Sequence, residues 1–78
     1  MVKKAESRKL NGYICVLRPD HPRAMHGNAW DGYVYEHIVV LEEDLGRPLR
    51  KNEVGHHLDE DRSNNNVENL IALTKGHH

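Results

Sequence analysis

The sequence contains little cysteine, few aromatic residues and no long apolar run, and these shortages exclude several classes of protein. Its single cysteine, Cys15, can form neither an internal disulfide nor a Cys-x-x-Cys zinc site. No stretch comes near the roughly 20 apolar residues that a membrane-spanning helix requires. The charged N-terminus lacks the apolar centre of a signal peptide, and an unpaired thiol suits a reducing compartment. We therefore expect a soluble, intracellular protein.

The apolar content allows only a thin core. The chain has 78 residues, contains no Phe, and carries four aromatic residues, Tyr13, Trp30, Tyr33 and Tyr35. A domain of this size buries little surface and often needs a metal, a disulfide or a partner for extra stability. We therefore expect one domain at most.

The chain also lacks an excess of charge of one sign. Its net charge is −1, whereas a protein that coats nucleic acid would be strongly basic. The charges are instead segregated into two basic clusters and one acidic run: Lys3, Lys4, Arg8 and Lys9; Arg47, Arg50 and Lys51; and Glu42, Glu43 and Asp44. Each cluster is either a solvated surface or a phosphate contact, and charge alone does not decide between them.

Histidine, by contrast, is abundant. Seven of the 78 residues are His, and four of them form two adjacent pairs, His56-His57 and His77-His78. Neutral imidazole binds divalent metals and is also a base whose ordinary pKa lies near neutral pH. Hydrolysis of a phosphodiester uses both properties, because a base must take a proton from water and a cation must offset charge on the phosphate. Taken alone, however, an adjacent pair of His residues more often lies on the surface without a function than in a metal-binding or catalytic site.

The first half of the chain is expected to contain two short strands and a helix. The predicted segments are a loose basic arm at residues 1–10, a strand at 13–17, a loop or wide hairpin connection at 18–32, and a second strand at 33–34. Val34, Ile38, Leu41 and Leu45 then recur at helical spacing, so that one apolar stripe would face the core. Gly46 is expected to end this helix, and Pro48 forbids its continuation soon afterwards.

The second half is expected to bring the two His pairs together. Residues 52–58 are a short connection that carries His56-His57, and neighbouring side chains on extended backbone point to opposite sides. Residues 59–66 are all polar and rich in Asn and Asp, which favours an ordered loop. Residues 70–73 are predicted to be a short buried strand that returns antiparallel to the first pair. His78 would then lie near His56, so that two imidazoles could bind one cation.

Several separate motifs, in this order, resemble the HNH endonuclease family and specifically its small phage and intron-type members. The motifs are Gly32-Tyr33-Val34-Tyr35-Glu36-His37, Leu45-Gly46-Arg47-Pro48-Leu49, the run from Glu53 through His56-His57-Leu58-Asp59 to Asn64-Asn65, Val67-Glu68-Asn69-Leu70, and Leu73-Thr74 followed by His77-His78. The resemblance spans about residues 12–78. It implies an α+β fold: a small ββα-metal (His-Me finger) domain with short antiparallel strands and one preceding helix. We expect this domain at residues 11–78, after the basic arm at 1–10.

The resemblance also implies roles for individual residues. His57 corresponds to the general base that activates water, and Asn69 to the Asn that braces the loop and helps to orient this base. His56 and His78 correspond to the ligands of one divalent metal. His37 corresponds to a supporting or phosphate-contacting residue, with core packing as the alternative. The remaining supporting residues are Asn64 and Asn65, and the candidate DNA contacts are Arg47, Arg50, Lys51 and Arg62.

The implied activity is the metal-dependent hydrolysis of DNA phosphodiester bonds. The alternative is a catalytically inactive, metal-stabilised module that binds nucleic acid. Mg²⁺, Mn²⁺, Ni²⁺ and Zn²⁺ are all candidates for the ion, although His ligands favour transition metals. The implied partners are DNA together with a second copy of the chain or a larger phage protein, and no membrane. The implied compartment is the cytoplasm of a bacterial or phage-infected cell.

Two features depart from the family pattern. Glu60 stands where relatives usually carry Gly, so the loop is expected to need a strained or altered turn. The short last helix of the family, which holds the last ligand, would begin after His78. The sequence is therefore expected either to be trimmed before that helix or to represent a minimal or defective member.

Overall fold

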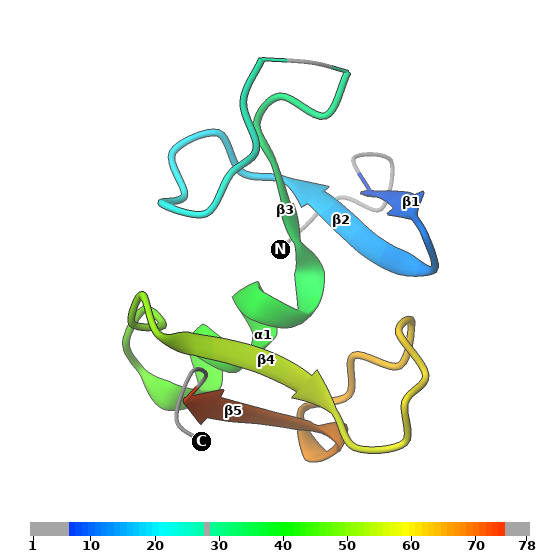
Figure 1. Cartoon of the computed structure of the whole chain (residues 1–78), viewed down its shortest axis with the longest axis vertical. Coiled ribbons are helices and arrows are strands. Elements are labelled where there is room, and N and C mark those ends of the chain that lie inside the picture. The colour runs from blue at the N-terminus through cyan, green and yellow to red at the C-terminus, as the bar shows by residue number, and fades with distance from the viewer. Residues whose placement is uncertain (1–6, 28, 75–78) are drawn as a thin grey trace.

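The first part of the chain forms a three-stranded antiparallel sheet (Figure 1). The structure is a computed structural model that describes residues 7–27 and 29–74. The strands are β1 (Ser7–Leu10), β2 (Tyr13–Leu17) and β3 (Tyr33–Tyr35), in the order β1-β2-β3. The turn between β1 and β2 is Asn11-Gly12, with φ of 53° and 86°, and an Asn-Gly pair with positive φ is the favoured two-residue hairpin turn. Residues 7–10 were expected to belong to a loose basic arm, but they form a strand of the sheet.

The segment between β2 and β3 is the wide connection that the sequence predicted. A backbone hydrogen bond from Arg18 N to Gly32 O at 2.8 Å joins its two ends, and one from Met25 N to Tyr33 O at 2.8 Å ties its middle to β3. The His21 imidazole also reaches across to Glu42 in the following helix, with 2.5 Å between Nε2 and Oε1. This loop is therefore attached to the helix through a side chain as well as to the sheet through its backbone.

Helix α1 (Glu36–Leu45) begins directly after β3 and matches the prediction in position and in its end. His37, Ile38 and Leu41 form its buried face, as helical spacing requires. Gly46 follows in the left-handed conformation, with φ of 74°, and its N–H donates to Glu42 O. Leu45 was expected to extend the buried stripe but is 40% exposed, because the helix ends there.

The second sheet is an antiparallel hairpin of β4 (Glu53–His57) and β5 (Leu70–Thr74). The loop between them ends in a short 3₁₀ helix, η2 (Val67–Asn69). Strand β5 was predicted to be buried, and this is correct only for one face. Leu70 is 7% exposed, whereas Ile71 and Leu73 are 41% and 44% exposed, because alternate side chains of a strand point to opposite faces.

Helix α1 lies between the two sheets and contacts β2, β3, β4 and β5 (Figure 1). The largest fully buried side chains are Val16, Val34 and Cys15, and the core also includes Ile38 and Leu41 of α1. The chain therefore has the predicted α+β architecture, with short antiparallel strands and one helix ahead of the strand that carries the His pair. None of the helices in the described part of the chain has the length and apolar character needed to cross a membrane.

Candidate active site

The two adjacent histidines at the end of β4 face opposite sides of the hairpin. His57 is only 6% exposed and pairs with Leu70 of β5, whereas His56 is exposed and pairs with Ile71. This alternation is what extended backbone dictates for neighbouring residues. One imidazole is therefore held by its surroundings, and the other is open to solvent.

Both histidines nevertheless line one pocket of about 270 Å³. Its other walls are Tyr13 of β2, Gly55 of β4, and Glu60 and Arg62 of the loop that follows β4. A larger pocket of about 590 Å³, between the first sheet, α1 and β4, is lined by His37 but by neither of the paired histidines. We place the candidate site in the smaller pocket, because it brings both members of the His56-His57 pair together with the side chain of Arg62.

The His57 imidazole is fixed by a hydrogen bond that the sequence did not specify. Its Nε2 lies 2.7 Å from Oδ1 of Asn65, and Nδ2 of Asn65 donates to Oε1 of Glu36 at 2.7 Å. Glu36 was not among the predicted site residues. The sequence motif Glu36-His37 indicated the histidine as a candidate site residue. The glutamate could have been predicted from the sequence only by its position directly before that histidine.

His37 packs beside His57 in the interior rather than in the candidate site. It is 5% exposed, and its ring centroid lies 4.6 Å from that of His57 and 5.7 Å from that of Tyr13. The pKa of His37 is lowered from its ordinary 6.5 to about 4, mainly by burial and then by the nearby charge of His57, whereas a hydrogen bond with the Gly55 backbone opposes the shift. A neutral, buried ring of this kind supports the packing role that was one of the two alternatives.

Asn69 braces the loop between β4 and β5, as the family resemblance implies. Its side-chain Oδ1 accepts from Asp59 N, and its Nδ2 donates to Asp59 Oδ1 and to Asn64 O. Asn64 Nδ2 donates in turn to the second carboxylate oxygen of Asp59. Hydrogen bonds from Asn64, from the Asp61 backbone and from Asn69 lower the pKa of Asp59. The amide that contacts the His57 imidazole belongs to Asn65 and not to Asn69.

Glu60 occupies the strained position that the sequence predicted. Its φ is 63°, in the left-handed region that a residue with a Cβ adopts only at a cost. Its backbone N–H donates to His57 O at 3.1 Å. This tight turn places Glu60 at the wall of the pocket, next to the histidines.

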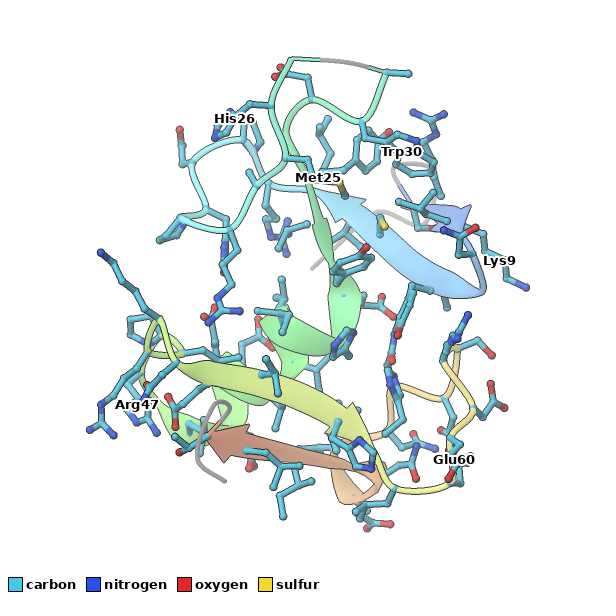
Figure 2. All side chains as sticks on the ribbon, viewed as in Figure 1. Lys9, Met25, His26, Trp30, Arg47 and Glu60 are labelled. Carbon is cyan, nitrogen blue, oxygen red and sulfur yellow. The ribbon has the colours of Figure 1, made fainter. Side chains whose placement is uncertain are left out.

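The four predicted DNA contacts lie at the two ends of the β4–β5 hairpin rather than in one patch. Arg62 lines the pocket, donates to Asn11 O at 2.9 Å and lies 5.1 Å from the centroid of the Tyr13 ring. Arg47 lies at the other end, as its position opposite Glu60 in Figure 2 shows. Arg50 and Lys51 precede β4 and share this far end with Arg47.

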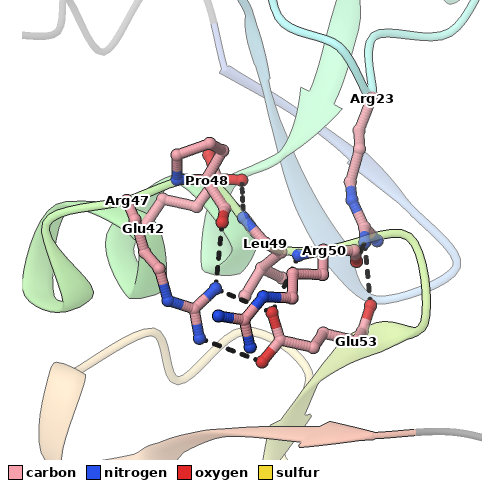
Figure 3. Close-up of polar contacts among 7 residues, drawn as sticks. All are labelled: Arg23, Glu42, Arg47, Pro48, Leu49, Arg50 and Glu53. Carbon is pink, nitrogen blue, oxygen red and sulfur yellow. Dashed lines mark hydrogen bonds and ion pairs between the residues drawn. The ribbon is translucent and has the colours of Figure 1, made fainter.

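Arg47 is engaged in a bidentate ion pair (Figure 3). Its two terminal nitrogens donate to the Glu53 carboxylate at 2.8 and 3.0 Å. Arg50 donates its backbone N–H to the same carboxylate, and Arg23 donates to the Glu53 backbone carbonyl. The bonds from Arg47 and Arg50 lower the pKa of Glu53 from 4.5 to about 2, with the Arg47 side chain as the largest cause. The Arg47 charge is thus largely compensated within the protein.

The structure describes only one of the two predicted metal ligands, His56. His78 lies outside the described residues, so its position relative to His56 is not part of the structure. Across residues 7–27 and 29–74, no group of three or more His, Cys, Asp and Glu side chains is arranged to hold a metal ion. The exposed imidazole of His56 is a suitable donor for a divalent transition metal, but the described residues alone do not form a complete ligand set.

Comparison with known proteins supplies a family for this arrangement. The family described as HNH endonuclease matches residues 34–78, which is more than half of the chain. The matched range begins in β3 and contains α1, both strands of the hairpin and the whole loop between them. No curated protein and no solved structure matches the chain.

Proposed function

The chain belongs to the HNH endonuclease family, and on this premise we propose that it is a metal-dependent endonuclease that hydrolyses DNA phosphodiester bonds. His57 would accept a proton from the attacking water as that water's oxygen bonds to phosphorus. The bond from phosphorus to the 3′ oxygen would then break, and this oxygen would take a proton from solvent water, leaving a 5′-phosphate and a 3′-hydroxyl.

One observation carries the proposal. His57 is bonded to Asn65 through Nε2 and also lines a pocket that contains an exposed imidazole and a guanidinium. A general base needs a fixed orientation and one free nitrogen within reach of water. Arg62, on the same wall, can offset the negative charge that develops on the phosphate. The pocket therefore offers a base and a positive charge side by side.

One divalent metal ion would be held by His56 together with His78. The exposure of His56 and the chemistry of imidazole fit this assignment and favour Mn²⁺, Ni²⁺ or Zn²⁺ over Mg²⁺. When bound, such an ion offsets charge on the phosphate and on the leaving oxygen. The remaining steps fall to residues of the chain: Asn69 holds the loop, Asn64 and Asn65 support it, and His57 moves the proton.

DNA affinity would come from few charges. We propose that Arg62 contacts the scissile phosphate, and that Arg50 and Lys51 contact the backbone at the far end of the hairpin. Arg47 would add little, because Glu53 already compensates its charge. Since the net charge is −1, firm DNA binding would need a second copy of the chain or a larger phage-encoded partner. The setting would be the cytoplasm of a bacterial or phage-infected cell.

The test is a nicking assay on supercoiled plasmid with EDTA, Mg²⁺, Mn²⁺, Ni²⁺ or Zn²⁺. We expect metal-dependent nicking that falls about 100-fold to 10,000-fold in His57→Ala, the range that general base catalysis contributes. His57→Ala should retain metal binding, measured by calorimetry, whereas His56→Ala should weaken metal binding and activity together. Full activity in His57→Ala would contradict the assignment of the base. A folded, metal-bound wild-type protein that retains DNA without nicking it would instead identify the inactive binding module.

A further inference from the structure

Three side chains from three segments form a short series of hydrogen bonds that ends on His57. Glu36 is the first residue of α1, Asn65 lies in the loop after β4, and His57 is the last residue of β4. Asn65 Nδ2 donates to Glu36 Oε1 at 2.7 Å, and Asn65 Oδ1 lies 2.7 Å from His57 Nε2. The amide of Asn65 therefore stands between a carboxylate and the imidazole of the base.

The carboxylate decides which way this amide points. An ionised carboxylate only accepts hydrogen bonds, so the NH₂ end of Asn65 must face Glu36. The amide oxygen must then face His57, and that oxygen also only accepts. Nε2 of His57 must therefore carry the hydrogen. The position of Glu36 in the first turn of α1 reinforces this polarity, because the partial positive charge of a helix N-terminus favours a negative side chain there.

The loop that carries Asn65 is itself held in place. Asn69 bonds to Asp59 through both ends of its amide, and Asn64 bonds to the same carboxylate. Asn65 follows Asn64 directly, so its backbone is fixed by these neighbours. A fixed backbone allows one amide to keep two directed bonds at once.

We propose that Glu36 is a positioning residue: acting through Asn65, it holds His57 in the tautomer with hydrogen on Nε2 and leaves Nδ1 as the bare nitrogen. A neutral imidazole has one donor nitrogen and one acceptor nitrogen, so fixing the first defines the second. His57 forms part of the pocket wall, and as the bare nitrogen of its ring Nδ1 would take the proton from water. The catalytic consequence rests on the proposed function, whereas the tautomer is a property of the free protein.

The tautomer can be read directly by NMR on the full chain. Long-range proton–nitrogen correlation spectra at pH 8 distinguish a protonated ring nitrogen from a bare one, and loss of signals in His57→Ala assigns the residue. We expect a protonated Nε2 and a bare Nδ1 in the wild-type protein. A wild-type His57 with the hydrogen on Nδ1 would overturn the proposal without any further variant.

Two substitutions test whether Glu36 sets this polarity. In Glu36→Gln the introduced amide can donate as well as accept, so Asn65 is free to turn over and His57 should become a mixture of tautomers. In the double variant Glu36→Gln with Asn65→Asp, the introduced amide donates to the introduced carboxylate, whose other oxygen again accepts from Nε2–H. The wild-type tautomer should then return. Glu43→Gln removes the same charge from an exposed position of the same helix and is the matched control.

Catalysis should follow the tautomer. We expect kcat for nicking to fall in Glu36→Gln by the fraction of His57 that has lost the Nε2–H form, with KM unchanged, and to recover in the double variant. An unchanged tautomer in a folded Glu36→Gln, or no recovery in a folded double variant, would overturn the proposal. A wild-type protein that shows the expected tautomer but never nicks DNA would overturn the proposed function and leave the positioning role standing.

Discussion

Glu60 is a single residue at which backbone strain and charge meet at the pocket. Its φ of 63° costs a residue with a Cβ about 1–2 kcal/mol, while glycine adopts it freely. Glycine also loses more backbone freedom on folding, which reduces the gain in stability by about 0.4–1 kcal/mol. Glu60→Gly should therefore stabilise the protein by about 0.5–1 kcal/mol, the difference between these two terms, measured by urea unfolding.

A comparison of two variants separates strain from charge at this position. Glu60→Gln keeps the strained backbone and removes the carboxylate, so it should leave the free energy of unfolding nearly unchanged. Both variants should bind a DNA duplex more tightly at low salt, because a negative charge leaves the pocket that would receive a phosphate. Equal stability of Glu60→Gly and Glu60→Gln would show that the strain in the turn is no larger than the about 0.4–1 kcal/mol that glycine loses in backbone freedom.

The residues of the candidate site were predictable to the extent that they lie in local motifs. The sequence placed His57 on extended backbone and Asn69 as the brace of an ordered loop, and in the structure Asn69 makes three hydrogen bonds with Asp59 and Asn64 of that loop. It did not identify the pair of Glu36 and Asn65, which are 29 positions apart. Sequence spacing does not distinguish among the three consecutive residues Asn64, Asn65 and Asn66. Only the packed structure distinguishes the one whose amide meets the imidazole.

At the scale of elements, the packing of α1 against β4 depends on the missing side chain of Gly55. A Cβ at this position would lie 2.6 Å from Cδ2 of His37 and 3.0 Å from Cδ1 of Leu41. The buried ring of His37 has little room to move, so β4 would have to shift away from the helix. We expect Gly55→Ala to destabilise the protein by about 1–3 kcal/mol in thermal or urea unfolding, the range typical of overpacking.

A double-mutant cycle identifies the cause of this loss. His37→Ala removes the ring that the new methyl group would strike, so Gly55→Ala should cost much less in that background than in the wild type. Additive effects of the two substitutions would show that the glycine is needed for another reason. The cycle is read on the free energy of unfolding and requires no enzymatic activity.

The elements themselves were predicted with uneven success, for physical reasons. Helix α1 was predictable because its apolar spacing and Gly46 agree. Strand β1 was not, because its exposed Arg8 and Lys9 gave it the composition of a basic arm; charged residues are common on such edge strands. Arg8 is ordered by contact with Trp30, whose ring centroid lies 4.2 Å from the guanidinium carbon. That contact joins positions far apart in sequence and leaves no local pattern.

At the scale of the whole molecule, one helix supports both the core and the candidate site. The first turn of α1 provides Glu36, which accepts a hydrogen bond from Asn65, and its middle provides His37, Ile38 and Leu41 for the core. The far end provides Glu42, which accepts from Leu49 N and contacts His21. In so small a protein, anything that loosens α1 should therefore affect folding and catalysis together.

Acid should expose this dependence through His37. Its pKa is about 4 in the folded protein and 6.5 in an unfolded chain, so unfolding takes up a proton between these pH values. The stability that neutral His37 provides is thus present above pH 6.5 and is lost as the pH falls towards about 4. A shift of this size corresponds to roughly 3 kcal/mol at most. Below that window, a second loss should follow as Glu53 is protonated, between pH 4.5 and about 2.

The variant His37→Phe separates the two windows, because a phenyl ring fills the same space and does not titrate. We expect a lower stability at pH 7, since the hydrogen bond with the Gly55 backbone is lost, but a flatter decline between pH 6.5 and 4 in urea unfolding. The loss below pH 4.5 should persist, because the Arg47–Glu53 pair is intact in this variant. A decline as steep as that of the wild type would place the acid-sensitive group elsewhere and show that the buried imidazole does not control folding at mildly acidic pH.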